Sequence, residues 1–290
     1  MGLINDLKAI NYNWRKWKYN TLLKTKIVNY YKKNKNLITD NELLNGLQYY
    51  LQNDITVFPY NFKNEYNNLT LNIENDNGLN YYLLNGHKLF FKKDWSILSC
   101  KSYLKTLLIE QDYRSPHSYC NNVFKVNSDE TLLDIGAAEG NFSLLSVDTA
   151  NEIYLFEYNT EWFSVLQKTF EPLKNKVKLF NKKVEHVSSN TSSLALDDLE
   201  ELYTKKLFIK MDVEGSERAI FKGMEKLLSS NKHIRLVICT YHGYNDAIEF
   251  ENYFKQLGFQ TEFSNGYMLY YFAKDLKPPY LRKGVLRVWR

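Results

Sequence analysis

The sequence has few cysteines and prolines, and it lacks any long apolar run. Its three cysteines, Cys100, Cys120 and Cys239, are an odd number and lie far apart, with no C-x-x-C spacing. This pattern indicates neither a disulfide framework nor a zinc site, so we expect no bound metal and a cytoplasmic location. No stretch approaches the roughly 18 apolar residues of a membrane-spanning helix, and the first residues lack the apolar run of a signal peptide.

A strong net charge is also missing. Lysine and arginine number 38 against 33 acids, for a formal net charge of +5 and a sequence pI near 8.8. This balance permits an anionic partner or substrate, but it falls short of the basic surface of a nucleic-acid-binding protein, so we expect no nucleic-acid partner. With 290 residues, of which 44% are hydrophobic, the chain fits one large domain or one domain with a smaller attachment.

Acids are scarce in residues 1–36, where Asp6 stands alone among nine lysines and arginines. Apolar residues recur there at alternating spacings of four and three, which places them on one helical face. These residues are Leu3, Leu7, Ile10, Trp14 and Trp17. Such a basic amphipathic helix either docks on an anionic surface, such as the inner face of a membrane, or packs its tryptophan stripe on the domain or on a second subunit. We favour packing, and both interpretations stay open.

Turn signals and short apolar runs divide the rest of the chain. Residues 1–95 are predicted to form an N-terminal extension, a helix followed by a small mixed region with a hairpin at 79–84 and 88–91. Residues 96–275 are predicted to form the main domain, and residues 276–290 are predicted to form a basic C-terminal tail. The domain's expected strands are 131–135, 153–156, 177–180, 207–211 and 234–240, with helices from 141 and at 160–170, 216–228 and 247–257, and a closing hairpin of 259–263 with 268–272.

Strand–helix alternation of this kind is typical of an α/β fold with a mostly parallel sheet and helices on both faces, here with a terminal antiparallel hairpin. In such sheets, ligands bind beyond the carboxyl ends of the strands. The ends of the predicted strands are therefore the places to look for chemistry.

A glycine loop follows the first of these strands, with Gly136 and Gly140 in the run D-I-G-A-A-E-G at 134–140. Glycines here permit a tight turn and a close approach of a ligand to the backbone. The spacing G-x-x-x-G differs from the G-x-G-x-x-G that wraps a dinucleotide pyrophosphate. Asp134 precedes the first glycine by two residues, where we expect it to face the ligand. A carboxylate suits a cofactor that carries ammonium and sulfonium charges better than it suits a phosphate.

Acidic residues also end two other strands. Glu157 ends the second strand, where an acid accepts hydrogen bonds from ribose hydroxyls; this feature is shared with NAD enzymes. Period-two alternation places Lys210, Asp212 and Glu214 on one side at the end of the fourth strand. Either an ion pair or the lining of an acceptor pocket explains these three, and we favour the pocket. Glu217 is interpreted as a first-turn acid that the helix dipole favours.

A histidine ends the fifth strand, in C-T-Y-H at 239–242. The imidazole of His242 is able to take a proton from an acceptor hydroxyl near neutral pH, although a lone histidine is often structural. A second histidine, His117, lies in the polar stretch E-Q-D-Y-R-S-P-H-S-Y at 110–119, just before the first strand. Taken alone, this stretch reads equally well as a polar loop with Pro116 starting a helix.

Taken together and in this order, the segments resemble an FkbM-type methyltransferase from about residue 94 to residue 273. The resemblance rests on 110–119, L-D-I-G-A-A-E-G at 133–140, Glu157, L-D-D-L at 196–199, K-M-D-V-E-G-S-E at 210–217, C-T-Y-H at 239–242 and G-Y-M at 266–268. It implies a Rossmann-like class I methyltransferase fold and S-adenosylmethionine-dependent O-methylation, commonly of a sugar or another natural-product hydroxyl in polysaccharide biosynthesis. Departures from the family pattern are Ala138 in place of a middle glycine and Tyr158 in place of a proline.

The resemblance also implies roles for individual residues. His242, Asp212 and Glu214 border the acceptor, and we hypothesise that His242, oriented by one of the two acids, removes the hydroxyl proton. The residues implied to hold S-adenosylmethionine are Asp134, Gly136, Ala137, Gly140, Asn141, Glu157, Glu110, Ser115 and His117. Two alternatives stay open, an NAD(P)-dependent oxidoreductase on a similar sheet and a non-catalytic protein that binds S-adenosylmethionine.

Overall fold

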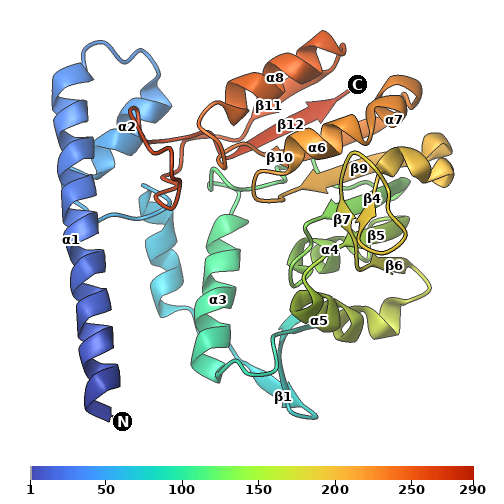
Figure 1. Cartoon of the computed structure of the whole chain (residues 1–290), viewed down its shortest axis with the longest axis horizontal. Coiled ribbons are helices and arrows are strands. Elements are labelled where there is room, and N and C mark those ends of the chain that lie inside the picture. Colours follow the sequence, from blue (N-terminus) through green and yellow to red (C-terminus); the bar gives the residue numbers. More distant parts are fainter. Residues whose placement is uncertain (1) are drawn as a thin grey trace.

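A central sheet of seven strands organises the chain, whose computed structural model describes the backbone of residues 2–290 and the side chains of residues 16–290 (Figure 1). The strand order is β11-β12-β10-β9-β4-β5-β6. Neighbours from β10 to β6 run parallel, and β12 runs antiparallel to both β10 and β11. The bounds are β4 Glu130–Ile135, β5 Glu152–Phe156, β6 Val177–Phe180, β9 Lys206–Met211, β10 Ile234–Cys239, β11 Gln260–Phe263 and β12 Val285–Trp289. This is the predicted Rossmann-like fold.

Helices cover both faces of this sheet because its strands are apolar on both sides. Leu132 of β4 packs in one core with residues of α3, α4 and α5, whereas its neighbour Leu133 packs in a second core with residues of α6, α7 and α8. The bounds are α3 Ile97–Glu110, α4 Asn141–Ser146, α5 Thr160–Phe170, α6 Glu217–Lys222, α7 Glu225–Ser230 and α8 Asp246–Gln256. Alternate residues of each strand thus supply alternate layers.

Local capping explains several of these boundaries. The side chain of Asn159 accepts hydrogen bonds from two backbone N–H groups at the start of α5, so Asn159 is the N-cap. Gly258 follows α8 with φ of 83°, the left-handed conformation that ends many helices. Residues 116–119 are not helical, so Pro116 does not start a helix.

The predicted helix at 216–228 is two helices. α6 ends at Lys222 and α7 begins at Glu225. Gly223 between them is packed so closely on the backbone of Glu185 that a side chain there would meet its oxygen at 2.1 Å. The carboxylate of Asp197 accepts hydrogen bonds from backbone N–H groups of Lys226 and Leu227 and so caps α7. The L-D-D-L segment at 196–199 therefore stabilises the start of α7.

The closing hairpin has a different second strand from the one expected. β11 pairs with β12, whereas Met268 forms only an isolated bridge with Arg282 and Leu269 donates to the carbonyl of Val57. Residues 276–290 are consequently no tail, since they include an interior strand of the sheet. The run V-L-R-V-W places Val285, Leu286 and Val288 in the core. This burial favours β12 as the partner of β11 over the strand at 268–272, which a turn at 265–266 would have joined to β11.

Residues 41–95 share the main core. Their strands are β1 Glu74–Asp76, β2 Leu79–Leu84 and β3 His87–Phe90, which form a small antiparallel sheet, with α2 Asn41–Tyr49 before them. Leu89 and Phe91 pack in one cluster with Leu132 of the central sheet, and Phe90 packs against Val165 of α5. The region predicted as an extension is therefore continuous with the domain. A further short ladder joins β7 Lys183–Val184 and β8 Ser193–Leu194.

The first helix, α1 Gly2–Asn34, runs along one side of the molecule (Figure 1). Its Leu23 and Ile27 are buried against Tyr50, Leu269 and Leu281, so this half packs on the domain through residues outside the predicted stripe. The side chains of Leu3, Leu7, Ile10 and Trp14 lie outside the described residues, and the last member of that stripe, Trp17, is 64% exposed. Among the described residues, no helix is both long and apolar enough to cross a membrane.

Candidate active site

A cleft of about 590 Å³ opens at the carboxyl edge of the central sheet. The ends of β4, β5, β9 and β10 all contribute to it, as expected for a sheet of this topology. Its charged and aromatic lining is Phe156, Glu157, Tyr158, Trp162, Lys182, Lys183, Asp212, Glu214, Tyr241, His242 and Tyr270. Of the residues predicted for the cofactor, Gly136 and Glu157 line this cleft, whereas Ala137, Gly140 and Asn141 do not.

Left-handed backbone builds the glycine loop. Gly136 has φ of 76° and Gly140 has φ of 83°. A side chain at Gly136 would meet the backbone oxygen of Asp212 at 2.0 Å, and one at Gly140 would meet Leu166 and Phe170 of α5 at 2.7 Å. These glycines are therefore required for packing the loop against β9 and α5. Ala138, the departure from the family pattern, also adopts a left-handed φ of 47°.

Asp134 does not face the cleft. Its carboxylate is buried, accepts from the hydroxyl of Ser143 at 2.7 Å and forms an ion pair of 3.0 Å with Lys210. Lys210 also donates to the carbonyl of Gly136 at 2.6 Å. Burial opposes the charge of Lys210, but Asp134 and Asp212 raise its pKa. Alternation along β4 turns this side chain toward Lys210, and the expected contact of Asp134 with a ligand stays a prediction.

Glu157 lies at the end of β5, where the sequence predicted it. Its carboxylate accepts from the backbone N–H of Ala138 at 3.0 Å and from that of Asn159 at 2.7 Å. These two bonds join the glycine loop to the start of α5. An ionised carboxylate has about four acceptor positions, so Glu157 retains capacity for hydroxyl groups of a ligand.

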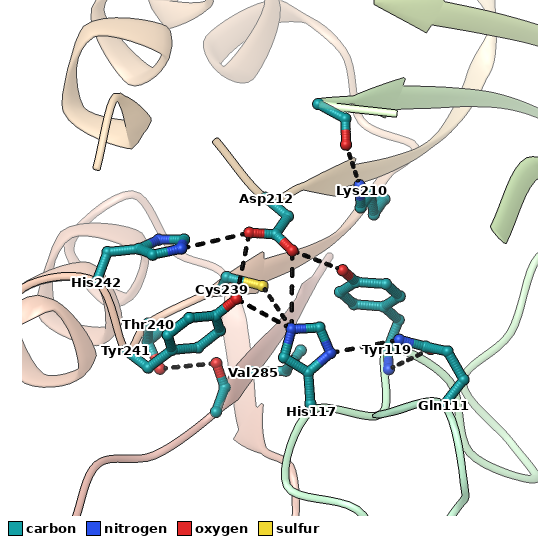
Figure 2. A network of polar contacts seen from close by, with 12 residues as sticks. Gln111, His117, Tyr119, Lys210, Asp212, Cys239, Thr240, Tyr241, His242 and Val285 are labelled. Carbon is teal, nitrogen blue, oxygen red and sulfur yellow. Dashed lines mark hydrogen bonds and ion pairs between the residues drawn. The ribbon is translucent and has the colours of Figure 1, made fainter. Parts of the chain in front are cut away.

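Asp212 is the centre of a polar network at the end of β9 (Figure 2). It accepts from the hydroxyl of Tyr119 at 2.9 Å and from that of Tyr241 at 3.4 Å. The Nε2 atoms of His117 and His242 lie 3.7 Å and 3.4 Å from its oxygens. Burial favours its neutral form, but Lys210, the two histidines and the Tyr119 hydroxyl outweigh burial and lower its pKa. A side chain that is 21% exposed thus presents an ionised carboxylate to the cleft.

His117 lies beneath the cleft, in contact with the network. Its Nε2 is 3.1 Å from the Tyr241 hydroxyl and its Nδ1 is 3.4 Å from the amide nitrogen of Gln111. Burial lowers its pKa to about 4, so the ring is neutral at physiological pH. The hydroxyl of Ser115 accepts from the His117 backbone N–H at 3.1 Å. Since both side chains are buried, they position the network and are not part of the cleft lining.

His242 lines the cleft between two carboxylates. Its Nδ1 is 2.9 Å from Glu217 and its Nε2 is 3.4 Å from Asp212. Burial disfavours the charged ring, but the hydrogen bond to Glu217 and the charge of Asp212 outweigh it and raise the pKa of His242. Of the two acids predicted to orient this ring, Asp212 does so. Glu214 instead is exposed on the cleft wall, with a left-handed φ of 51°.

Glu110, at the end of α3, is held close to the network. Burial raises its pKa to about 8, with further contributions from the charges of Asp212 and Glu139. Glu139, in the glycine loop, is itself buried and accepts from the hydroxyl of Tyr103 at 2.5 Å. Acids therefore outnumber bases around this part of the site, where Lys210 is the buried cation nearest to Asp212.

Two arginines that sequence reasoning placed in a tail hold the site together. Arg282 donates to the carbonyls of Tyr241 and His242 at 2.7 Å and 2.9 Å. Arg287 donates to the carbonyls of Ser118 and Tyr119 at 3.0 Å and 3.1 Å. Because these carbonyls lie 40 to 169 residues away in the sequence, no local pattern marked this role.

One group of described residues has ligand atoms close enough for a metal ion, namely His117, Asp212 and Cys239, within 4.8 Å of one another. The Tyr241 hydroxyl already contacts both His117 and Asp212, and Lys210 places a positive charge beside them. Burial also raises the pKa of the Cys239 thiol, which disfavours the thiolate that metals bind. We therefore interpret the group as a hydrogen-bonded network.

Comparisons with solved structures give distant matches. A precorrin-6y C5,15-methyltransferase of Geobacter metallireducens is 16% identical, with a TM-score of 0.39, over 57% of this chain and 82% of that one. A Streptococcus mutans protein assigned as a methyltransferase, in complex with SAH, is 15% identical, with a TM-score of 0.35, over 64% and 96%. An rRNA methylase of Streptococcus thermophilus is 13% identical, with a TM-score of 0.34, over 57% and 89%.

A search of curated proteins found no match. The sequence itself matches the model described as the Methyltransferase FkbM domain over residues 42–261. This match begins in α2 and ends in β11, so it covers the small sheet, the glycine loop and the Asp212 network. The chain belongs to the FkbM methyltransferase domain family, as its motifs predicted.

Proposed function

We propose that this protein is an S-adenosylmethionine-dependent O-methyltransferase whose acceptor is a hydroxyl group of a sugar in a glycan or of another natural product. One observation carries the proposal. A single cleft presents Glu157 at the end of β5, with acceptor capacity for a ribose, and an ionised Asp212 at the end of β9. A nucleoside-binding acid and a proton-accepting group thus face the same space.

The residues around the cleft fit this cofactor in charge. S-adenosylmethionine carries a sulfonium and an ammonium group, and it supplies an activated methyl group. Glu110, Glu139 and Asp212 lie on the side of the glycine loop and the end of β9. Because burial raises the pKa of Glu110 to about 8, Glu110 is protonated at neutral pH, and it is the ionised Asp212 in the cleft that disfavours the pyrophosphate of NAD(P). Glu157 and Gly136 would hold the nucleoside, with Glu110 on the side of the cationic groups.

Residues of this chain have two tasks in the transfer. The first is alignment, because a displacement at carbon depends on the orientation of the acceptor oxygen. The second is removal of the hydroxyl proton as the new C–O bond forms and the C–S bond breaks. We infer that Asp212 accepts this proton and passes it to Nε2 of His242, 3.4 Å away, so that His242 takes the proton through Asp212 and not, as hypothesised from the sequence, directly from the acceptor. The raised pKa of His242 and the lowered pKa of Asp212 favour that direction.

The acceptor side supports a neutral polyol. Tyr241 and Tyr270 are in edge contact at 5.1 Å between ring centroids, and both line the cleft beside the exposed Glu214. Aromatic faces next to a carboxylate suit the apolar faces and the hydroxyls of a sugar. Mass analysis of surface glycans from cells with and without this protein tests the acceptor, and loss of one methyl group from a glycan is expected.

Calorimetry and a methyl-transfer assay test the activity. The wild-type protein is expected to bind S-adenosylmethionine and not NADH, and to transfer labelled methyl to a hydroxyl of an added glycan extract. Binding of NADH in its place would support the oxidoreductase alternative. Binding of S-adenosylmethionine with no transfer to any extract fraction would favour the non-catalytic alternative.

Residues 1–36 are a candidate surface for contact with an anionic membrane. The described half of α1 carries exposed Trp17 and Leu22 among lysines, so a peripheral contact with an anionic membrane is compatible with catalysis. Sedimentation with anionic liposomes tests this contact, which replacing the exposed Trp17 and Leu22 by Ser is expected to weaken while the buried Leu23 and Ile27 stay in place. Sedimentation unchanged by these substitutions would place any membrane contact elsewhere.

A further inference from the structure

Glu217 has surroundings that its place in the sequence does not explain. It is the first residue of α6, where an acid commonly lies in solvent near the helix N-terminus. Its side chain is instead 0% exposed. One carboxylate oxygen, Oε1, lies 2.9 Å from Nδ1 of His242, and the other accepts no hydrogen bond from the described residues. Burying a carboxylate is costly unless a charged or strongly donating partner compensates for it.

The partner of Glu217 reaches the cleft. His242 is 6% exposed, and its second ring nitrogen lies 3.4 Å from Asp212. The three side chains therefore form a continuous carboxylate–imidazole–carboxylate chain. It begins in the core at Glu217 and ends at the carboxylate that faces the cleft.

We propose that Glu217 is a positioning residue for methyl transfer, one that accepts from Nδ1–H of His242 and keeps Nε2 directed at Asp212. This inference rests on the proposed function for its catalytic consequence, although the geometry of the ring does not. In the neutral ring, a hydrogen bond at one nitrogen fixes which nitrogen carries the lone pair. With Nδ1–H donated to Glu217, the lone pair lies on Nε2, on the side of Asp212.

The proton path follows from this arrangement. The hydroxyl proton of the acceptor moves to Asp212 and then to Nε2, which leaves an imidazolium between two carboxylates. Loss of that proton to solvent restores the starting state. Glu217 thus lowers the free energy of the charged ring without touching the substrate.

Other charged groups also face this ring, and they set what a substitution changes. Asp246 of α8 contributes a further negative charge, and it is paired with Arg218 at 2.8 Å. The rings of Tyr241 and Tyr270 pack against His242 at centroid distances of 4.3 Å and 5.8 Å. Because Asp212 and Asp246 remain, loss of the Glu217 charge is expected to lower the pKa of His242 and not to abolish its titration.

Nuclear magnetic resonance of the histidine side chains tests the inference without any acceptor or cofactor. The chain has five histidines, so His242 is assignable by comparing wild type with His242→Gln. In wild-type protein, long-range ¹H–¹⁵N spectra are expected to show the proton of the neutral ring on Nδ1. In Glu217→Gln, the pKa of His242 is expected to fall by about 1 to 3 units.

Glu225→Gln is the matched control, because Glu225 is the first-turn acid of the neighbouring helix α7 and is exposed. It is expected to leave the His242 titration unchanged. Glu217→Asp keeps the charge and is expected to hold the pKa of His242 closer to wild type than Glu217→Gln does, which separates charge from packing. An unchanged tautomer and pKa in Glu217→Gln would overturn the proposal.

Kinetics then tests the catalytic consequence. Glu217→Gln is expected to reduce kcat at least about tenfold and to move the acid limb of its pH profile to lower pH, with the Kd for S-adenosylmethionine unchanged. A shifted titration together with an unshifted pH profile would overturn the role in methyl transfer and leave the geometry intact. Absence of methyl transfer in wild-type protein would instead refute the proposed function, while the resonance result still decides the orientation of His242.

Discussion

The two halves of the cleft are built by different means. On the side of β4 and β5, the site comes from one stretch of chain, residues 134–157, and its shape depends on left-handed glycines and on backbone N–H groups that bind Glu157. On the side of β9 and β10, segments from 110 to 287 meet at Asp212 and His242, and side-chain charges hold them. One half is a backbone structure, and the other is an electrostatic network.

This difference separates what each half controls. A backbone cradle fixes the position of a bound nucleoside and is insensitive to pH. A network of coupled carboxylates and imidazoles controls proton transfer, and its state changes with pH. Substitutions in the first half should therefore change affinity for the cofactor, whereas those in the second should change turnover.

The largest effect is expected where the two halves touch. Gly136→Ala places a carbon 2.0 Å from the backbone oxygen of Asp212 in a left-handed conformation, so the free energy of unfolding should fall by about 3 kcal/mol. Gly86→Ala has a similar φ, 84°, but open space around it, and should cost about 1 kcal/mol. Denaturant unfolding measures both. Equal losses would show that backbone conformation alone, without the contact to Asp212, sets the requirement.

Asp212→Asn should separate turnover from binding most clearly. The amide keeps the shape of the side chain but no longer accepts a proton, so kcat should fall about 100- to 1,000-fold. Calorimetry should find the affinity for S-adenosylmethionine within about threefold of wild type. A variant with normal turnover would remove Asp212 from the proton path.

Glu157→Gln should weaken cofactor binding and leave turnover nearly unchanged. Loss of the charged acceptor is expected to weaken S-adenosylmethionine binding roughly tenfold, while turnover at saturating cofactor changes little. Asn159→Ala is a useful comparison, since it removes the cap of α5 and leaves the Glu157 carboxylate in place. An unchanged Kd in Glu157→Gln would refute a ribose-binding role.

The effect of Glu110→Gln is expected on stability alone, and it depends on pH. Burial raises the pKa of Glu110 to about 8 from an ordinary value near 4.5, so between these values the folded state binds more protons than the unfolded state. As pH rises through this window, the free energy of unfolding of the wild-type protein should therefore decline by up to about 1.4 kcal/mol per pH unit from this group alone. Thermal unfolding at pH 5 and pH 8 should show a smaller decline in the variant. Parallel declines would show that Glu110 is ionised throughout.

Local signals allowed most of the fold to be predicted. Strand β4, helix α5 and the end of α8 at Gly258 follow from apolar runs, periodicity and a left-handed glycine. Long-range contacts decided the rest. Strand β12 could not be recognised as an interior strand, because its partners β10 and β11 lie far away in sequence and its arginines read as a basic tail.

The candidate site shows the same division. Gly136, Glu157, Asp212 and His242 were found because each stands at the end of a predicted strand. The direction of the Asp134 side chain and the burial of Glu217 were not predicted, since both depend on which side chains face them in the folded protein. The C-T-Y-H motif located His242 but gave no distance to Glu217, three residues beyond Glu214.

The position of β12 has a consequence for synthesis of the protein on the ribosome. β12 lies between β10 and β11, yet it is translated after both. A nascent chain that ends before residue 285 therefore holds β10, a buried and apolar strand, with one hydrogen-bonding edge unpaired. Such an edge is a template for association with other chains, and closing it requires a late insertion between two existing elements. Ribosome pausing after β11 and before β12 is translated should thus lower the yield of native protein more than pausing near the glycine loop does.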